Sequence, residues 1–184
     1  MNPELAALKN VVTRLEHGGF SYMLTGSMAL SFYVAPRMTR DIDLVIDIAS
    51  PRTAELVAIF DEDYYVSAEA VREAADLRGM FNVLYLPGSI KIDLIVRKDS
   101  PYRREEFGRR NRTDRLGFPL WVVSREDLIL SKLVWARNTR SELQFGDVRA
   151  LLAGEIDRDY LERWALELEV AEDLKACIDA RHGS

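Results

Sequence analysis

Hydrophobic residues recur along the chain at two spacings, one typical of strands and one typical of helices. Short runs rich in β-branched and aromatic residues predict strands at 20–24, 41–48, 64–67, 80–86, 90–96 and 120–123. Helical spacing between caps and breakers predicts helices at 2–16, 28–34, 50–60, 68–77, 124–137, 143–153, 157–167 and 170–180. Pro87-Gly88-Ser89, between two strand-like runs, is typical of a hairpin. We therefore predict an α/β (α+β) fold with an α/β core at 1–123 and a helical region at 124–184 packed on it.

The strand predicted at 41–48 has an acidic side. Side chains alternate along a strand, so its isoleucine and leucine residues face a core, whereas Asp41, Asp43 and Asp47 face the other way. The backbones of Asp41 and Asp43 are then roughly 6–7 Å apart, close enough for their carboxylates to share a metal ion. A half-exposed strand with a solvated acidic face explains this segment alone equally well.

A second strand supplies a further acid. The run at 90–96 is strongly β-forming and carries Asp93 near its centre, where a charge is costly unless it is paired or binds a metal. If this strand lies beside the one at 41–48, Asp41, Asp43 and Asp93 form a cluster of three carboxylates. Such a cluster suits Mg²⁺ or Mn²⁺, because these ions prefer oxygen ligands and keep positions open for substrate phosphates.

Upstream of both acids, Gly26-Ser27 connects a predicted strand to a predicted helix. Glycine lets the backbone approach a phosphate closely, and the N–H groups at a helix start attract anions. A Gly-Ser pair alone is more often a turn with a helix cap. Its position ahead of Asp-x-Asp and a distant strand aspartate makes phosphate binding the stronger interpretation.

This order of motifs resembles the nucleotidyltransferase superfamily that includes DNA polymerase β. The finer pattern, Gly26-Ser27 followed by Arg37-Met38-Thr39-Arg40-Asp41-Ile42-Asp43-Leu44, is similar to the branch of AbiEii-type toxins of type IV toxin–antitoxin systems and their MenT relatives. Leu130-Ser131-Lys132-Leu133 and Asp147-Val148-Arg149 extend the resemblance, which spans about 20–152.

The resemblance implies a minimal nucleotidyltransferase fold, a mixed sheet flanked by helices with a helical bundle behind it. Asp41 and Asp43 would bind the metal, and Asp93 would help to bind it or activate the acceptor hydroxyl. Gly26 and Ser27 would hold the β- and γ-phosphates of a nucleoside triphosphate, Lys132 would contact the triphosphate, and Asp147 would also have a role at the site. One departure is Gln144-Phe145-Gly146, where many relatives place a Lys-Asp pair before the tail aspartate.

Helix geometry independently directs two of these tail residues inward. Lys132 lies four residues after Leu128, and Asp147 lies four residues after Leu143, so each falls within an apolar stripe. The alternatives are that Lys132 extends to the surface and that Asp147 forms a structural salt bridge, for which Lys132 itself is a candidate partner. Arg40, next to the metal strand, is a further candidate for the triphosphate, although an exposed arginine paired with an acid is the simpler alternative.

Composition narrows the class of protein. The net charge of −5 disfavours a general nucleic-acid binder, but Arg97–Arg115 contains eight basic and four acidic residues. These arginines are candidates for contacts with RNA such as tRNA, or simply for a charged helix surface.

The single Cys177 excludes a disulfide framework, and His17 and His182 are too few for a histidine zinc site. No apolar run spans a bilayer and the N-terminus does not resemble a signal peptide, so we expect a cytoplasmic protein with no membrane partner.

The favoured function is Mg²⁺-dependent transfer of a nucleoside monophosphate to an unidentified hydroxyl, on tRNA, a protein, an aminoglycoside or another small molecule. Two alternatives remain open. A binding or regulatory module, for example an antitoxin-like partner, would keep the fold without catalysis. Asp-x-Asp also fits haloacid-dehalogenase-type phosphatases, in which the first aspartate is a nucleophile on the first strand of a parallel sheet. The acceptor, the preferred nucleotide, any cognate antitoxin and the oligomeric state cannot be identified from the sequence.

Overall fold

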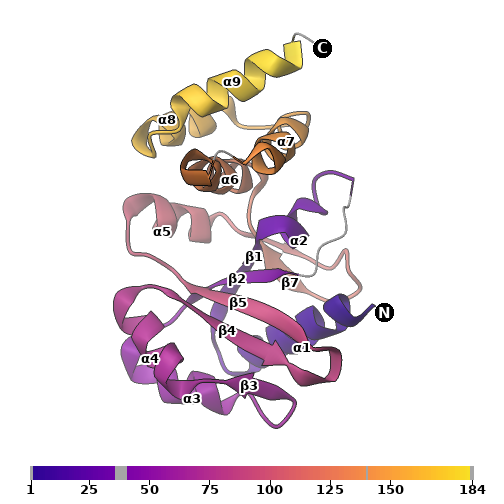
Figure 1. Cartoon of the computed structure of the whole chain (residues 1–184), viewed down its shortest axis with the longest axis vertical. Helices are drawn as coiled ribbons and strands as arrows, with labels where there is room; N and C mark the ends of the chain where they lie inside the picture. The colour runs from indigo at the N-terminus through magenta and orange to yellow at the C-terminus, as the bar shows by residue number, and fades with distance from the viewer. Residues whose placement is uncertain (1, 36–40, 140, 183–184) are drawn as a thin grey trace.

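The computed structural model describes residues 2–35, 41–139 and 141–182. Strands and helices alternate along the first two thirds of this chain, and helices alone follow (Figure 1). The strands are β1 (Ser21–Thr25), β2 (Ile42–Asp47), β3 (Tyr64–Val66), β4 (Met80–Tyr85), β5 (Ile90–Val96), β6 (Asn111–Thr113) and β7 (Leu120–Val122). The helices are α1 (Pro3–His17), α2 (Gly26–Leu30), α3 (Thr53–Ala58), α4 (Ala68–Leu77), α5 (Pro101–Gly108), α6 (Arg125–Thr139), α7 (Glu142–Leu151), α8 (Arg158–Glu167) and α9 (Ala171–His182), with 3₁₀ turns η1 (Ser50–Arg52) and η2 (Leu86–Gly88).

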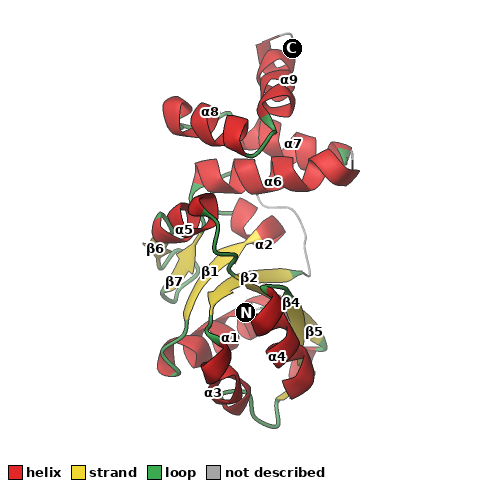
Figure 2. Ribbon diagram, turned by 90° about the vertical axis from the view of Figure 1, so that its left-hand side faces the viewer, coloured by secondary structure: helices red, strands yellow, loops and turns green. Residues whose placement is uncertain are grey.

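Within the described residues, the strands form one mixed seven-stranded sheet in the order β3-β4-β5-β2-β1-β7-β6. β2 runs parallel to β5 and β1 runs parallel to β7, whereas the other neighbours are antiparallel. The predicted hairpin is confirmed, because β4 and β5 pair antiparallel around η2. The helices lie in two groups: α1, α3 and α4 at one end of the molecule, and α6 to α9 stacked at the other, beyond α2 and α5 (Figures 1 and 2). The predicted mixed α/β fold with a helical tail is confirmed.

The two central strands, β2 and β5, each have one completely buried apolar face. Helices α1 and α4 both contact β5, and their apolar residues are buried. Burial of this face fixes the register, because a slip by one residue would move charged side chains into the core. The fully buried residues on the two strands are Ile42, Leu44, Ile46, Ile92, Leu94 and, at the end of β5, Val96.

The fold differs from the prediction locally, and strand β6 is one element that was not predicted. The helix predicted at 28–34 begins earlier and ends at Leu30, after which tight turns bonded to Met28 and Ala29 replace helical geometry. Helix α5 was not predicted, although Ser100 caps it by accepting a hydrogen bond from Arg103 N–H and Pro101 occupies its first turn. The abundance of arginine concealed this helix.

A buried polar network connects α5, α6 and α8. The Asp127 carboxylate is completely buried and accepts hydrogen bonds from the Ser124 hydroxyl at 2.6 Å and the Tyr160 hydroxyl at 2.7 Å. Arg109 from α5 donates to the same carboxylate at 3.3 Å, and its guanidinium lies 3.7 Å from the centre of the Tyr160 ring. These contacts join residues on both sides of the predicted boundary between 1–123 and 124–184. The division of the chain at that boundary remains a prediction.

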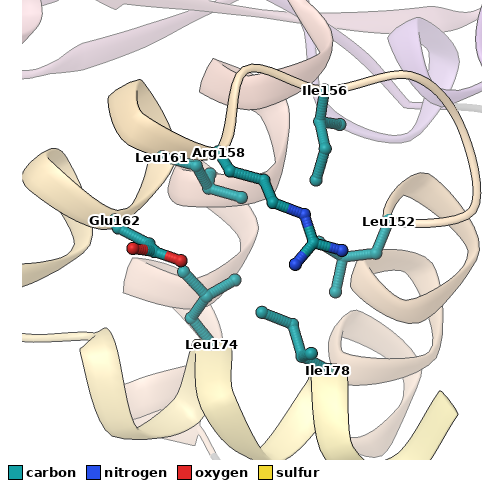
Figure 3. A pocket seen from close by; sticks show the side chains of 7 residues that line it. All are labelled: Leu152, Ile156, Arg158, Leu161, Glu162, Leu174 and Ile178. Atoms are coloured by element: carbon teal, nitrogen blue, oxygen red, sulfur yellow. The ribbon is translucent and has the colours of Figure 1, made fainter. Parts of the chain in front are cut away.

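The helical tail also contains a small apolar cleft of about 10 Å³ (Figure 3). It lies between α7, α8 and α9 and is lined by Leu152, Ile156, Arg158, Leu161, Glu162, Leu174 and Ile178. Ligand pockets usually occupy several hundred Å³, so this cleft does not accommodate a nucleotide. None of the helices in the described part of the chain has the length and apolar composition to cross a bilayer.

The Asp127 network predicts a large loss of stability when its acceptor is removed. Asp127→Ala should lower the free energy of unfolding by about 3–5 kcal/mol, because buried Ser124 and Tyr160 and the partly buried Arg109 lose their shared partner. Tyr160→Phe, which removes one donor, should cost about 1–2 kcal/mol. Chemical denaturation followed by circular dichroism measures both changes. Asp179→Ala, at an exposed acid on α9, is the control, and an equal effect of Asp127→Ala and Asp179→Ala would contradict the prediction.

Candidate functional site

A row of polar side chains crosses four neighbouring strands at the same level. Thr25 on β1 pairs with Asp43 on β2, Asp43 pairs with Asp93 on β5, and Asp93 pairs with Asn82 on β4. Paired strands lie about 4.8 Å apart, so Asp43 and Asp93 are direct neighbours on the face opposite the apolar core. The two acidic strands are therefore neighbours, which is the condition on which the expected carboxylate cluster depends, and Asp41 precedes β2 at the same edge.

Asp43 is the most electrostatically perturbed acid of this row. Burial, the negative charge of Asp93 and then that of Asp41 raise its pKa from 3.8 to about 6. The positive charges of Lys91 and Lys132 oppose this rise. The site is therefore a partly buried concentration of negative charge that a cation would stabilise.

Asp93 already has polar partners in this structure. The Asn82 side-chain amide donates a hydrogen bond to one carboxylate oxygen, and the Lys91 ammonium contacts the other, Oδ2, at 3.0 Å. Within the described residues, no three His, Cys, Asp or Glu side chains converge into a ready-made metal site. Asp41, Asp43 and Asp93 remain predicted ligands that share one edge of the sheet, with Asp93 turned toward its neighbours.

Gly26 packs directly against the Asp43 carboxylate. Its φ of +66° lies in the left-handed region that favours glycine, and a Cβ at this position would lie 2.1 Å from Asp43 Oδ2. The backbone at the start of α2 therefore packs directly against the acidic row. Ser27 follows in the first turn of the helix. The predicted proximity of the Gly-Ser turn to the carboxylates is confirmed, whereas its role with phosphates remains a prediction.

Lys132 and Asp147 form a buried ion pair between α6 and α7. The Lys132 ammonium lies 2.8 Å from Asp147 Oδ2 and donates to Gln144 Oε1 at 3.0 Å. Both residues are buried as predicted, and the salt bridge considered from the sequence is present. Leu143 is 56% exposed, so the apolar stripe inferred for α7 does not extend to its first turn. Since the Lys132 charge also acts on Asp43, this pair links the helical tail to the strand acids.

The arginines of 97–115 mostly have protein partners. Arg103 donates to both oxygens of buried Glu106, and Arg109 contacts Glu126 and Asp127. Arg97 pairs with Asp47 at 3.1 Å. Most of this segment therefore joins secondary-structure elements, which explains its positive charge without an RNA partner. Arg40 lies outside the described residues.

Sequence reasoning missed three residues that contact the candidate groups. Lys91 and Asn82 bind Asp93, and Gln144 binds Lys132. Lys91 could have been recognised, because it lies two residues before Asp93 and therefore on the same face of its strand. Asn82 could not, since its contact depends on the register of β4 against β5.

The close approach of Gly26 to Asp43 can be tested with alanine. Gly26→Ala should lower the free energy of unfolding by about 2–4 kcal/mol, because left-handed strain is combined with a steric clash. Gly19 is the matched control, since it has the same φ of +66° and nothing within 4 Å of a built Cβ. Gly19→Ala should cost only about 1 kcal/mol. Equal losses in denaturant titrations would show that the clash contributes nothing.

The raised pKa of Asp43 predicts a stability cost that depends on pH. Because the pKa in the fold, about 6, exceeds the ordinary 3.8, ionisation destabilises the folded state. This cost is absent below about pH 4 and complete above about pH 7. Without divalent cations, Asp43→Asn should therefore raise the free energy of unfolding at pH 8 by about 1–3 kcal/mol.

The difference between this variant and the wild type should shrink toward pH 4 in denaturant titrations. Asp114→Asn, at an exposed acid, should show no such change. Equal stabilities of Asp43→Asn and wild type at pH 8 would refute the electrostatic interpretation.

Comparison with solved structures places this fold among nucleotidyltransferases. The antibiotic-resistance factor ANT(2″)-Ia, described with substrate-regulated conformation dynamics, matches with a TM-score of 0.53 and 16% identity over 97% of this chain and 92% of its own. An antigenic nucleotidyltransferase-like protein from Paracoccidioides brasiliensis matches with a TM-score of 0.57 and 18% identity, over 97% and 93% of the two chains. A search of curated proteins gave no significant match.

The position of the Asp-x-Asp motif does not fit the phosphatase alternative. That pattern places the motif on the first strand of a parallel sheet, whereas β2 follows β1 and pairs antiparallel with it. The model of the family "Nucleotidyl transferase AbiEii toxin, Type IV TA system" matches residues 13–180. The chain therefore belongs to the AbiEii family of nucleotidyltransferase toxins of type IV toxin–antitoxin systems, and the protein is a nucleotidyltransferase.

Proposed function

We propose that the protein transfers a nucleoside monophosphate from a nucleoside triphosphate to a hydroxyl group, and that the reaction requires Mg²⁺ or Mn²⁺. The observation that carries this proposal is the in-register pairing of Asp43 with Asp93, beside Gly26 and under the influence of the Lys132 charge. The α/β part of the chain thereby supplies carboxylates for the proposed metal and a close backbone turn for the proposed phosphate. The helical part supplies a buried lysine.

The residues fit a hard divalent cation. Asp41, Asp43 and Asp93 provide only carboxylate oxygens, which Mg²⁺ and Mn²⁺ prefer. Their mutual repulsion, expressed in the raised pKa of Asp43, is relieved by a positive ion. When bound, the metal would supply charge stabilisation for the triphosphate and for the attacking oxygen.

The triphosphate side of the site combines Gly26, Ser27 and Lys132. The absence of a side chain at Gly26 keeps the backbone open to phosphate oxygens, and the Ser27 hydroxyl can donate to them. Asp147 and Gln144 hold the Lys132 ammonium in a fixed position, so little conformational entropy is lost when it meets a phosphate. Arg40 remains a further candidate on the basis of the sequence.

In the proposed reaction, the acceptor oxygen attacks the α-phosphorus in line with the leaving group. The bond between the α-phosphorus and the bridging oxygen to the β-phosphate breaks, and pyrophosphate leaves. The Asp93 carboxylate accepts the proton of the acceptor hydroxyl, and Asp41 and Asp43 would hold the metal. Lys132 neutralises charge on the phosphates as pyrophosphate departs.

Membership of this toxin family is the basis on which we propose a protein partner and consider an acceptor. A toxin of a type IV system acts beside a cognate antitoxin, which we propose as the partner of this protein. RNA, including tRNA, remains an acceptor to test. Because Arg103 and Arg109 are held in internal ion pairs, the more exposed Arg104 and Arg112 are the better candidates for phosphate contacts within the arginine segment.

Nucleotidyl transfer can be tested with nucleoside triphosphates labelled at the α-phosphate, mixed with RNA, protein and small-molecule fractions of a cell extract. Label should enter one fraction only when Mg²⁺ or Mn²⁺ is present. Asp43→Ala should reduce the rate by at least about 10²-fold, because it would remove a ligand of the proposed metal. Lys132→Met should reduce kcat/KM by about 10²-fold, because it removes a positive charge that stabilises the phosphates in the transition state.

Lys98→Met is the matched control for Lys132→Met, since it removes an equal charge from the exposed surface. Full labelling by Asp43→Ala, or labelling that persists in excess EDTA, would refute the proposed mechanism. Labelled RNA would identify a nucleic-acid acceptor, and labelled protein or small molecules would exclude that choice.

A further inference from the structure

Among the described residues, Lys91 is a cation that contacts Asp93 and has no part in the proposed reaction. It lies two residues before Asp93 on β5, so both side chains leave the same face of the strand. The Lys91 ammonium lies 3.0 Å from Asp93 Oδ2, and the Asn82 amide donates to the other oxygen. Together, Lys91 and Asn82 engage both oxygens that Asp93 would offer to a metal.

The Lys91 charge acts on the whole acidic edge. The contact with Asp93, together with the charges of Asp41 and Asp43, raises the pKa of Lys91, and its positive charge lowers the pKa of Asp43. The other cation acting on Asp43 is Lys132, from α6. Lys91 thus partly balances the same carboxylates that the proposed metal would balance.

The two lysines differ in how firmly they are held. The Lys132 side chain is 5% exposed and is fixed by Asp147 and Gln144. The Lys91 side chain is 54% exposed, and a single exposed ion pair on a flexible four-carbon chain is weak. Lys91 can therefore leave Asp93 by rotating into solvent, whereas Lys132 cannot leave its pair without disrupting a buried contact.

We propose that Lys91 is a displaceable internal counter-ion, which balances the strand acids and competes with the divalent cation for Asp93. This inference rests on the proposed function, because it requires a metal at the acidic row. Metal binding would then require the Lys91 ammonium to leave the Asp93 carboxylate. The Lys91 side chain would therefore lower the affinity of the site for the free divalent cation.

The test is direct titration of the full-length protein with Mn²⁺, without nucleotide, followed by electron paramagnetic resonance of the free ion. Lys91→Met should bind Mn²⁺ about 2- to 5-fold more tightly than the wild type, the range expected when one weak ion pair is removed. Lys91→Arg, which keeps the charge, should remain close to the wild type. Lys98→Met is the control for loss of a surface charge, and it should not change the affinity.

A second readout excludes a folding artefact. In EDTA, Lys91→Met should have a lower thermal midpoint than the wild type, because the acids lose a balancing charge. Saturating Mn²⁺ should then raise its midpoint by more than that of the wild type, as tighter binding to the folded state requires. Equal or weaker Mn²⁺ binding by Lys91→Met overturns the inference.

The failure of this inference can be separated from that of the proposed function. If Mn²⁺ binds the wild type and Asp43→Ala abolishes that binding, but Lys91→Met binds like the wild type, only the role of Lys91 is refuted. If the wild type does not bind Mn²⁺, with or without a nucleoside triphosphate, the metal-dependent function and the counter-ion role are both refuted.

Discussion

Electrostatic repulsion between Asp43 and Asp93 is the constraint around which the candidate site is arranged. The parallel pairing of β2 with β5 sets these acids side by side, and the buried isoleucine and leucine side chains on the opposite face prevent either strand from slipping. Hydrophobic burial thereby holds two like charges together that would otherwise separate. Burial of the apolar core provides the free energy that offsets this repulsion. The paired acids therefore destabilise the fold locally, although the core on the opposite face stabilises the sheet.

Two kinds of positive charge balance these acids. Lys132 comes from a helix held by buried polar contacts, including Asp127 with Tyr160 and Ser131 with the Glu106 carboxylate. Those contacts lie far from the strand acids in sequence, yet they decide where α6 runs and therefore where Lys132 lies. Lys91 instead comes from the acidic strand itself, and its half-exposed side chain is held by a single ion pair with Asp93. A fixed charge suits a substrate phosphate, and a rotating one suits exchange with an ion.

The sequence predicts best those features that depend on local periodicity. Alternation in 41–48 and 90–96 identifies the strands and the side on which Asp43 and Asp93 lie, and glycine at 26 marks the turn that approaches them. In the chain, the parallel neighbours β2 and β5 are separated by two α-helices and two other strands. Their register could therefore not be predicted from the sequence and is known only from the structure. The exposure of Leu143 could not be predicted either, because periodicity places a residue on a helix face but does not show where its neighbours end.

The arginine segment shows why charge alone is a poor guide to a partner. Its net positive charge suggested phosphate contacts, but the acids that neutralise it are distant in sequence: Asp47 on β2, and Glu126 and Asp127 on α6. A charge count over 97–115 cannot include them. Once they are included, the segment serves mainly to attach α5 to the sheet on one side and to α6 on the other. The helix that carries Lys132 is then positioned by ion pairs, and we expect the acceptor at the acidic face of β2 and β5, where Asp41 is exposed and Asp43 and Asp93 are partly buried.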